Sequence, residues 1–372
     1  MARQPEDRRP LYGGHGIAEW YGAVFRNLDI AEQLARAANQ KPVTGEKFDC
    51  PFTTSFPPAA PRKEGQPNLK CTKSGGVCSL RAFFTSREGE WFQPPEQRGR
   101  LPPLRRKEIV TSYGGFAATC PMRFVENGTA FTSVAEAVLG TSAFEYVKEV
   151  GFLQRVLNPD QQPENVVGPI DAEGVSRELE NAENDDQGEL ASVGDVENVG
   201  RIDTILVDSA NHQNWCAVEL QAVYFSGGEM GPDFTAIKAQ VAPLAGSNEP
   251  VQILAPAKRR RPDFRSSGPK RLLPQLQIKV PTLRRWGKKM AVIVDAGFFN
   301  SLGPMEHVDH VSNADIVWCV VTYDETPDGQ AAPLRVSALI NTTLESAIVG
   351  LTAGKAVTKP EFERRIKQKI GS

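Results

Sequence analysis

Two apolar segments joined by a polar turn constrain the fold of this chain more than any other feature. Arg201–Val207 (RIDTILV) and Trp215–Val223 (WCAVELQAV) each have the composition of a β-strand, and Asn211–Asn214 predicts the turn between them. Side chains two positions apart on a strand point to the same face of a sheet. Glu219 and Gln221 therefore share one face of the second predicted strand.

Acidic residues in and before this predicted hairpin form a candidate metal site. If the two strands pair, Asp203 can lie across from Glu219 and Gln221, and Glu189 can reach in from the preceding segment. Carboxylates that meet at a sheet edge repel one another unless a hard divalent cation lies between them. A cation held in this way can activate water and stabilise an in-line displacement at phosphorus, which predicts a metal-dependent nuclease. From these strands alone, ordinary solvated acids stay open as the alternative.

Length and composition leave room for a large core and disfavour several classes of protein. The chain has 372 residues, of which 24% are charged and 40% hydrophobic, enough for one large domain or two ordinary ones. No apolar run approaches the roughly 18 residues of a membrane span, and no signal-peptide core follows the polar N-terminus. We therefore expect a cytoplasmic protein with no membrane partner. Because the net charge is −2, a nucleic-acid surface requires local segregation of charge.

Four of the six cysteines fall in the first third of the chain, much of which is rich in proline and glycine. In a reducing compartment these four are candidates for a tetrahedral Cys₄ metal site. Their spacing contains no CxxC pair, so four unrelated buried thiols stay open as the alternative. Cys216 and Cys319 lie in predicted strands, where a thiol usually acts as a small core residue. The four candidate ligands are Cys50, Cys71, Cys78 and Cys120.

Helices are predicted both before and after the candidate site along the chain. Gly16–Phe25 has an amphipathic pattern typical of a helix, and Ser133–Leu157 predicts a longer helix with a break near Gly140. On that longer helix, Glu145 and Glu149 are expected to be solvated, with an approach to the catalytic metal as the alternative. Further expected elements are helices at Ile30–Asn39, Leu344–Leu351 and Lys359–Ile370, and buried strands at Met290–Val294 and Ile316–Thr322.

Acidic and basic residues are separated along the chain. Residues 158–188 are acidic and poor in apolar side chains, which predicts a flexible insertion. Residues 258–289 form the most basic segment, and arginine and lysine mixed with serine and glutamine are typical of phosphate and base-edge contacts. A solvated charged face is the alternative, but segregation on a nearly neutral chain favours an anionic polymer as partner. The basic residues are Lys258, Arg259, Arg260, Arg261, Arg265, Lys270, Arg271, Lys279, Arg284, Arg285, Lys288 and Lys289.

Several of these motifs, taken in order, resemble the NotI-like family of type II restriction endonucleases. Gly16–Gly22 (GIAEWYG) looks like the start of that family, and the four cysteines look like its four-cysteine region. Gly188-Glu189-Leu190, then Asp203, then Glu219-Leu220-Gln221 look like its GEL…D…EIQ series. The resemblance covers about residues 15 to 325, and the long acidic stretch before Glu189 departs from the family pattern.

The resemblance implies an α/β (α+β) fold with the PD-(D/E)xK nuclease core, a mixed sheet flanked by helices. It implies a loop-rich N-terminal module in residues 1–125 and a nuclease domain in residues 126–372. A homodimer would cut double-stranded DNA at a palindromic site, GC-rich by family analogy, with Mg²⁺ as the catalytic ion. Iron is implied for the four cysteines, although four thiolates accept zinc equally well in geometry.

The resemblance also assigns the site residues. Asp203 and Glu219 would bind Mg²⁺, and Glu189 would orient water or a second ion. Gln221 stands where many members of the superfamily have lysine, and glutamine cannot act as a general base, so it would position the attacking water. Two other functions stay open: a DNA-binding protein with an inactive nuclease fold, and a nuclease of DNA repair or defence without a fixed recognition sequence.

Overall fold

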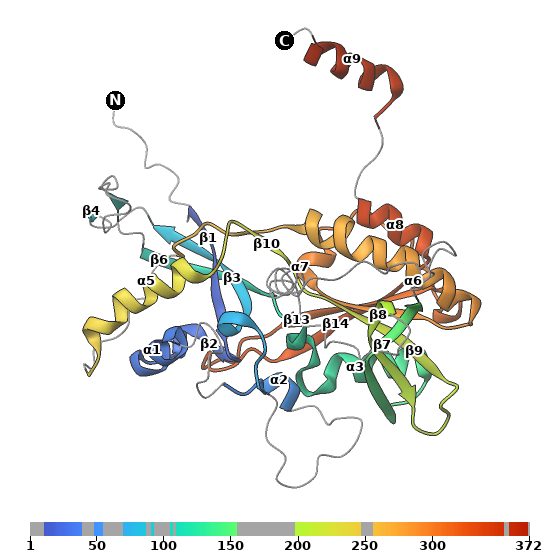
Figure 1. Cartoon of the computed structure of the whole chain (residues 1–372), viewed down its shortest axis with the longest axis horizontal. Helices are drawn as coiled ribbons and strands as arrows, with labels where there is room; N and C mark the ends of the chain where they lie inside the picture. The colour runs from blue at the N-terminus through green and yellow to red at the C-terminus, as the bar shows by residue number, and fades with distance from the viewer. Residues whose placement is uncertain are drawn as a thin grey trace, which may run out of the picture.

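The computed structural model describes nine stretches of the chain, which together form a mixed α/β structure built on two main sheets (Figure 1). Glu189 and the predicted acidic insertion lie outside these described residues. The described residues are 11–38, 48–54, 70–86, 91–92, 105–106, 109–154, 198–246, 256–352 and 357–370.

The larger sheet has six strands in the order β14-β13-β12-β9-β8-β7. β7, β8 and β9 form an antiparallel meander, β9, β12 and β13 run parallel, and β14 closes one edge as an antiparallel strand. The central strands β12 and β13 are almost entirely apolar and buried, as strands covered on both faces are. The strands are β7 (Phe144–Gln154), β8 (Asn198–Asp208), β9 (Trp215–Gln221), β12 (Met290–Asp295), β13 (Ile316–Tyr323) and β14 (Leu334–Thr342).

Helices cover both faces of this sheet, so the predicted mixed sheet flanked by helices is confirmed. On one face, η3 (Pro121–Gly128) and α3 (Thr129–Leu139) bury Phe124 and Phe131 against the strands. The other face carries the π-helical segment η7, followed directly by α6 and joined by α7 and α8. These elements are η7 (Ser266–Leu272), α6 (Leu273–Arg285), α7 (Ala296–Phe299) and α8 (Leu344–Thr352).

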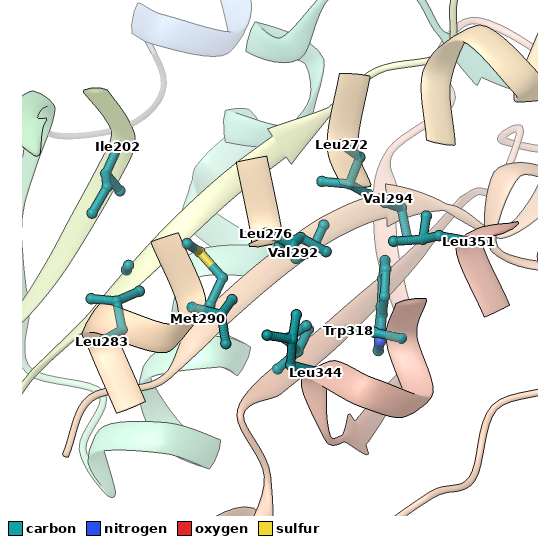
Figure 2. Close-up of a cluster of buried hydrophobic side chains, with 14 of the residues drawn as sticks. Ile202, Leu272, Leu276, Leu283, Met290, Val292, Val294, Trp318, Leu344 and Leu351 are labelled. Atoms are coloured by element: carbon teal, nitrogen blue, oxygen red, sulfur yellow. The ribbon is translucent and has the colours of Figure 1, made fainter. Parts of the chain in front are cut away.

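The α6 helix packs on the sheet through an apolar stripe (Figure 2). Leu276, Val280 and Leu283 recur at helical spacing, and each is at most 1% exposed. Leu276 lies beside Val292 and Leu283 beside Met290 of β12, so α6 is held directly above the centre of the sheet.

The smaller sheet has four strands in the order β2-β1-β3-β6. Helices α1 and α5 contribute to its core, in which Trp20 of β1 stacks on Phe234 of α5 with ring centroids 5.2 Å apart. Since α5 follows β9 in the chain, the polypeptide returns from the larger sheet to cover the smaller one. The elements are β1 (Leu11–Trp20), β2 (Ala23–Val24), β3 (Val77–Ser86), β6 (Ile109–Ala118), α1 (Ile30–Ala38) and α5 (Gly231–Val241).

A buried arginine joins the two sheets. Arg123 is 1% exposed, and its guanidinium pairs with Glu19 of β1 at 2.8 Å and with Glu126 at 2.7 Å. The same guanidinium lies 4.5 Å from the ring centroids of both Phe52 and Tyr323. Two carboxylates and two aromatic faces therefore compensate the desolvation of one charge, which fixes the smaller sheet against the larger one.

The predicted N-terminal helix at Gly16–Phe25 is wrong. Its first half lies in β1, which pairs antiparallel with β3 along its length, and Ala23–Val24 forms β2. Glycine disfavours a helix, and at Gly14 the backbone has a φ of 109°, which other residues rarely adopt. The ladder to β3, more than fifty residues away along the chain, outweighs the local helical pattern.

The predicted helix at Ser133–Leu157 is only half right. α3 ends at Leu139, where Gly140 takes the left-handed conformation typical of a helix C-terminus. The remainder forms strand β7, which pairs with β8. The other elements expected from the sequence are confirmed, namely α1, α8, α9, β8, β9, β12 and β13.

The last helix, α9 (Lys359–Ile370), lies apart from the rest of the chain and is exposed (Figure 1). None of the helices in the described parts of the chain combines the length and apolar character needed to cross a membrane.

The predicted division between an N-terminal module and a nuclease domain at residue 125 stays a prediction. The short elements are α2 (Pro51–Thr54), β4 (Trp91–Phe92), β5 (Arg105–Arg106), β10 (Phe225–Ser226), β11 (Arg261–Pro262), η1 (Phe25–Asn27), η2 (Ser74–Gly76), η6 (Ala242–Leu244) and η8 (Val311–Asn313).

Candidate active site

The pairing of β8 with β9 places two of the predicted acids opposite each other. Thr204 pairs with Val218, so the next positions, Asp203 and Glu219, face one another across the two strands. Glu219 shares its side of β9 with Ala217, which packs on the face covered by α6. The predicted approach of these two acids is therefore present in the structure.

A third acid continues this row onto β7. Lys148 pairs with Thr204 and Val150 with Ile202, so Glu149 lies opposite Asp203. Its side chain is 68% exposed and pairs with Arg201 at 3.1 Å, which agrees with the expected solvation. Its charge nevertheless contributes to raising the pKa of Asp203. Glu149 also has a φ of 52°, a conformation uncommon outside glycine.

Asp203 is held in place by the backbone of the neighbouring strand. Its Oδ2 accepts a hydrogen bond from the Leu220 amide at 2.9 Å. Burial raises the pKa of Asp203, while that hydrogen bond and the positive charge of Lys279 act in the opposite direction. The carboxylate thus has a fixed position and a partly compensated charge.

Glu219 is the most deeply buried acid of the site, at 2% exposure. Burial and the negative charge of Asp203 raise the pKa of Glu219 to about 7, although Lys279 acts to lower it. Burial raises the pKa of both acids, and a bound divalent cation would offset this cost of ionisation.

Lys279 is a residue of the basic segment that the structure places in contact with the candidate site. The sequence groups it with the expected DNA-binding residues, but it is 6% exposed and its Nζ pairs with Glu219 Oε1. On α6 it falls within the same stripe as the apolar Leu276, Val280 and Leu283. A lysine inside an apolar helical stripe was the signal that could have found it.

Gln221 lies at the end of β9, on the same side of the strand as Glu219. Its Nε2 donates to the carbonyl of Ala222 at 2.6 Å, so the amide nitrogen bends along its own strand. Its expected role of positioning water stays a prediction.

The basic segment is fastened to the strand that carries Glu219. Beyond β9 the chain continues into β10, which pairs with β11. The amide of Asp263 donates to the Tyr224 carbonyl at 2.7 Å, and the Tyr224 amide donates to Ser267 Oγ at 2.8 Å. The guanidinium of Arg271 lies 4.9 Å from the centroid of the half-exposed Tyr224 ring. The side chain of Arg271 therefore lies against the segment that directly follows β9.

The residues of this segment divide into two groups. Several are exposed, whereas Arg260 is 1% exposed and pairs with Asp233 at 2.6 Å. Lys288 and Lys289 donate to backbone carbonyls, and Arg284 pairs with acids of neighbouring elements. The exposed residues are Lys258, Arg259, Arg261, Arg265, Lys270, Arg271, Arg284 and Arg285.

The four N-terminal cysteines come together in space. Cys50 and Cys78 are buried with Phe52 in one cluster, and Cys71 packs against it. The Cys120 amide donates to the Cys78 carbonyl at 3.2 Å. Burial raises the pKa of three of these thiols, and neighbouring cysteines raise it further; these three are Cys71, Cys78 and Cys120.

Across the described residues, no three or more histidine, cysteine, aspartate or glutamate side chains are arranged to hold a metal ion. The cysteine cluster thus has the donor chemistry of a Cys₄ site but not its ligand geometry, and the metal there stays a prediction. Cys216 and Cys319 are fully buried in the core, as expected, and burial raises the pKa of each thiol to about 12.

Comparison with known families gives the class of protein. A family model described as "Restriction endonuclease NotI" matches residues 33–188 and 180–334. This match implies a site-specific deoxyribonuclease that binds DNA. The chain belongs to the NotI restriction endonuclease family. The two matched stretches meet in the acidic region before Glu189, where the sequence departs from the family pattern. A search of curated proteins gives no match to the chain.

The raised pKa of Glu219 predicts a pH-dependent stability. A glutamate with a pKa near 4.5 in the unfolded chain and about 7 in the folded protein makes folding less favourable as pH rises between those values. Without divalent ions, we expect the free energy of unfolding to fall by about 3 kcal/mol more in the wild type than in Glu219→Gln over that range. Urea unfolding in EDTA at pH 5 and pH 8 measures the difference. Parallel pH profiles for the two proteins would contradict it.

Proposed function

We propose that this chain is a type II restriction endonuclease that hydrolyses phosphodiester bonds in double-stranded DNA with Mg²⁺. The observation that carries the proposal is the opposition of Asp203 and Glu219 on neighbouring strands of a sheet in a member of this family. The mixed sheet with helices on both faces supports the PD-(D/E)xK core for this nuclease.

The charges of the site suit a divalent cation. Asp203 and Glu219 contribute two negative charges, and Lys279 contributes one positive charge. Carboxylate oxygens are the ligands that Mg²⁺ prefers, and these two carboxylates would hold it. When bound, the ion supplies Lewis acidity toward a phosphoryl oxygen and toward water. The protein's own residues then fix the geometry: Leu220 holds Asp203 through its amide, and Gln221 orients water by hydrogen bonds.

The exposed basic residues next to β9 form the proposed DNA surface. Arginine and lysine supply the phosphate contacts that position a duplex. The β10–β11 pairing and the Tyr224–Ser267 hydrogen bond tie this surface to the strand that carries Glu219. Phosphate contacts made here would therefore set the register of the duplex relative to the acids.

Further parts of the proposal rest on family membership. Two copies of the chain would form a homodimer that cuts both strands of a palindromic, GC-rich site in the cytoplasm. Glu189 would complete the site from the segment before β8. The N-terminal module in residues 1–125 would serve the nuclease domain in residues 126–372 as a metal-stabilised support.

Substitution of the two acids tests the nuclease directly. Asp203→Asn and Glu219→Gln remove a metal-binding charge with little change in volume, so plasmid cleavage in Mg²⁺ should fall by roughly 100-fold or more. Duplex binding in Ca²⁺, measured by fluorescence anisotropy, should persist. Glu145→Gln, at an exposed position of β7, is the matched control and should cut normally.

The digest also separates the alternatives. Discrete fragments with mapped ends indicate a restriction enzyme, and a smear indicates a nuclease without a fixed site. If the wild-type protein leaves the plasmid intact in Mg²⁺, the proposal is refuted. The remaining alternative is then a DNA-binding protein with an inactive nuclease fold.

The basic surface gives a salt-dependence prediction. Arg261→Ala, Lys270→Ala and Arg271→Ala should each lower the slope of log Kd against log salt concentration by roughly 1, because each removes one phosphate contact. Titrations of a duplex in Ca²⁺ at several salt concentrations measure the slope. Arg335→Ala on β14, where Arg335 pairs with Asp324 at 2.7 Å, is the control and should keep the wild-type slope. Unchanged slopes in all three variants would show that DNA does not bind at this surface.

The cysteine cluster gives a metal-content prediction. We propose that Cys50, Cys71, Cys78 and Cys120 hold a structural iron or zinc ion, because these four thiols come together and burial raises the pKa of Cys71, Cys78 and Cys120, a cost that ligation of a soft cation would relieve. Elemental analysis of the purified protein should find about one iron or zinc per chain. Cys71→Ser should lose the metal and lower the unfolding temperature, whereas Cys216→Ala should keep the metal. A metal-free wild-type protein would contradict this site.

A further inference from the structure

Lys279 is a buried cation in contact with the proposed metal ligand. A buried ammonium is costly unless it is paired, and its partner here is Glu219. Its positive charge also acts on Asp203, where it opposes the rise in pKa that burial causes. The amine of Lys279 thus lies close enough to affect both carboxylates that would hold a divalent cation.

We propose that Lys279 of α6 is a catalytic residue that contacts the scissile phosphate once a divalent ion takes its place on Glu219. This inference rests on the proposed function. In the metal-free protein the ammonium balances one of the two carboxylates. Lys279 would be repelled by a divalent cation held on these carboxylates, and its flexible four-carbon stem would let the amine move to the nearest negative group. In the complex with DNA, that group is a non-bridging oxygen of the phosphodiester.

The position of Lys279 on the fold supports this role. Apolar neighbours on α6 fix the base of its side chain against the sheet, as Leu276, Val280 and Leu283 are each at most 1% exposed. Gln221 has no charge to offer, and its amide nitrogen is engaged with the Ala222 carbonyl. Helix α6, which packs above β9, therefore supplies through Lys279 the positive charge that Gln221 lacks.

The charges of the loaded site then balance. The two carboxylates and the phosphodiester together carry three negative charges, and the divalent ion and Lys279 carry three positive charges. As a water oxygen bonds to phosphorus, the bond from phosphorus to the leaving deoxyribose oxygen breaks. That oxygen takes up one proton from solvent, and the attacking water loses one proton to solvent. Lys279 takes no part in these proton transfers and stabilises the charge on the phosphoryl oxygens, as preorganised donors do in other enzymes.

The test measures activity, ion affinity and DNA affinity in the same variants. Lys279→Met removes the charge, Lys279→Gln removes it but keeps a hydrogen-bond donor for Glu219, and Lys279→Arg keeps the charge with altered reach. Lys289→Met is the control, because Lys289 donates to the loop carbonyls of Ser312 and Ala314. Single-turnover cleavage in Mg²⁺, Ca²⁺ affinity by calorimetry without DNA, and duplex affinity in Ca²⁺ are measured for each.

We expect cleavage to fall roughly 100-fold or more in Lys279→Met and Lys279→Gln, and less in Lys279→Arg. Ca²⁺ should bind both neutral variants at least as tightly as the wild type, because a competing cation has gone. Duplex affinity in Ca²⁺ should change by less than roughly tenfold, since many phosphate contacts remain. The loss would therefore lie in the chemical step, which a merely structural ion pair would not produce.

Two results would overturn the inference. The first is cleavage by Lys279→Gln at close to the wild-type rate. The second is weaker Ca²⁺ binding that parallels the loss of cleavage, since Lys279 would then only hold Glu219 in place. If Lys279→Met does not fold, Lys279→Gln and Lys279→Arg decide the question. Absence of cleavage by the wild type itself refutes the proposed function instead, so the two failures are distinguishable.

Discussion

The site depends on one constraint, the register of β8 against β9 beneath helix α6. This register sets Asp203 opposite Glu219. Burial under the helix then makes both charges costly, so the pair requires a cation nearby. The protein meets that requirement with Lys279 from the helix itself. A shift of one residue in the pairing would turn Glu219 toward the opposite face of the sheet and separate the three groups.

The rest of the fold supports this arrangement from the ends of the central strands. The amide of Ala118 at the end of β6 donates to Asp295 of β12 at 2.8 Å, and the amide of Val223 donates to the Ala118 carbonyl at 2.9 Å. The smaller sheet is thus fixed at the point where β9 leaves the larger one. The chain beyond β9 then forms β10, which pairs with the basic strand β11. Acids and exposed basic residues are consequently held on one connected framework.

Local patterns in the sequence were sufficient for the elements that form the centre of the larger sheet. The apolar runs in β12 and β13 and the alternating pattern around Asp203 and Glu219 follow from burial on one or both faces, which needs no knowledge of distant partners. The same approach was wrong for β1 and β7. Both carry patterns compatible with a helix, and both became strands because a ladder with β3 or β8 outweighs the local preference.

The sequence by itself determined the strand pair, the acids on it, the four cysteines and the membership of a nuclease family, because these are properties of composition, order and spacing. Only the tertiary structure decided which basic residues face outward and which are buried. Lys279 and Arg271 both come from one basic run, yet one pairs with Glu219 in the core and the other lies on the surface over Tyr224. The physical reason is that the packing of a helix on the sheet decides whether each of its charged side chains points into the core or into solvent.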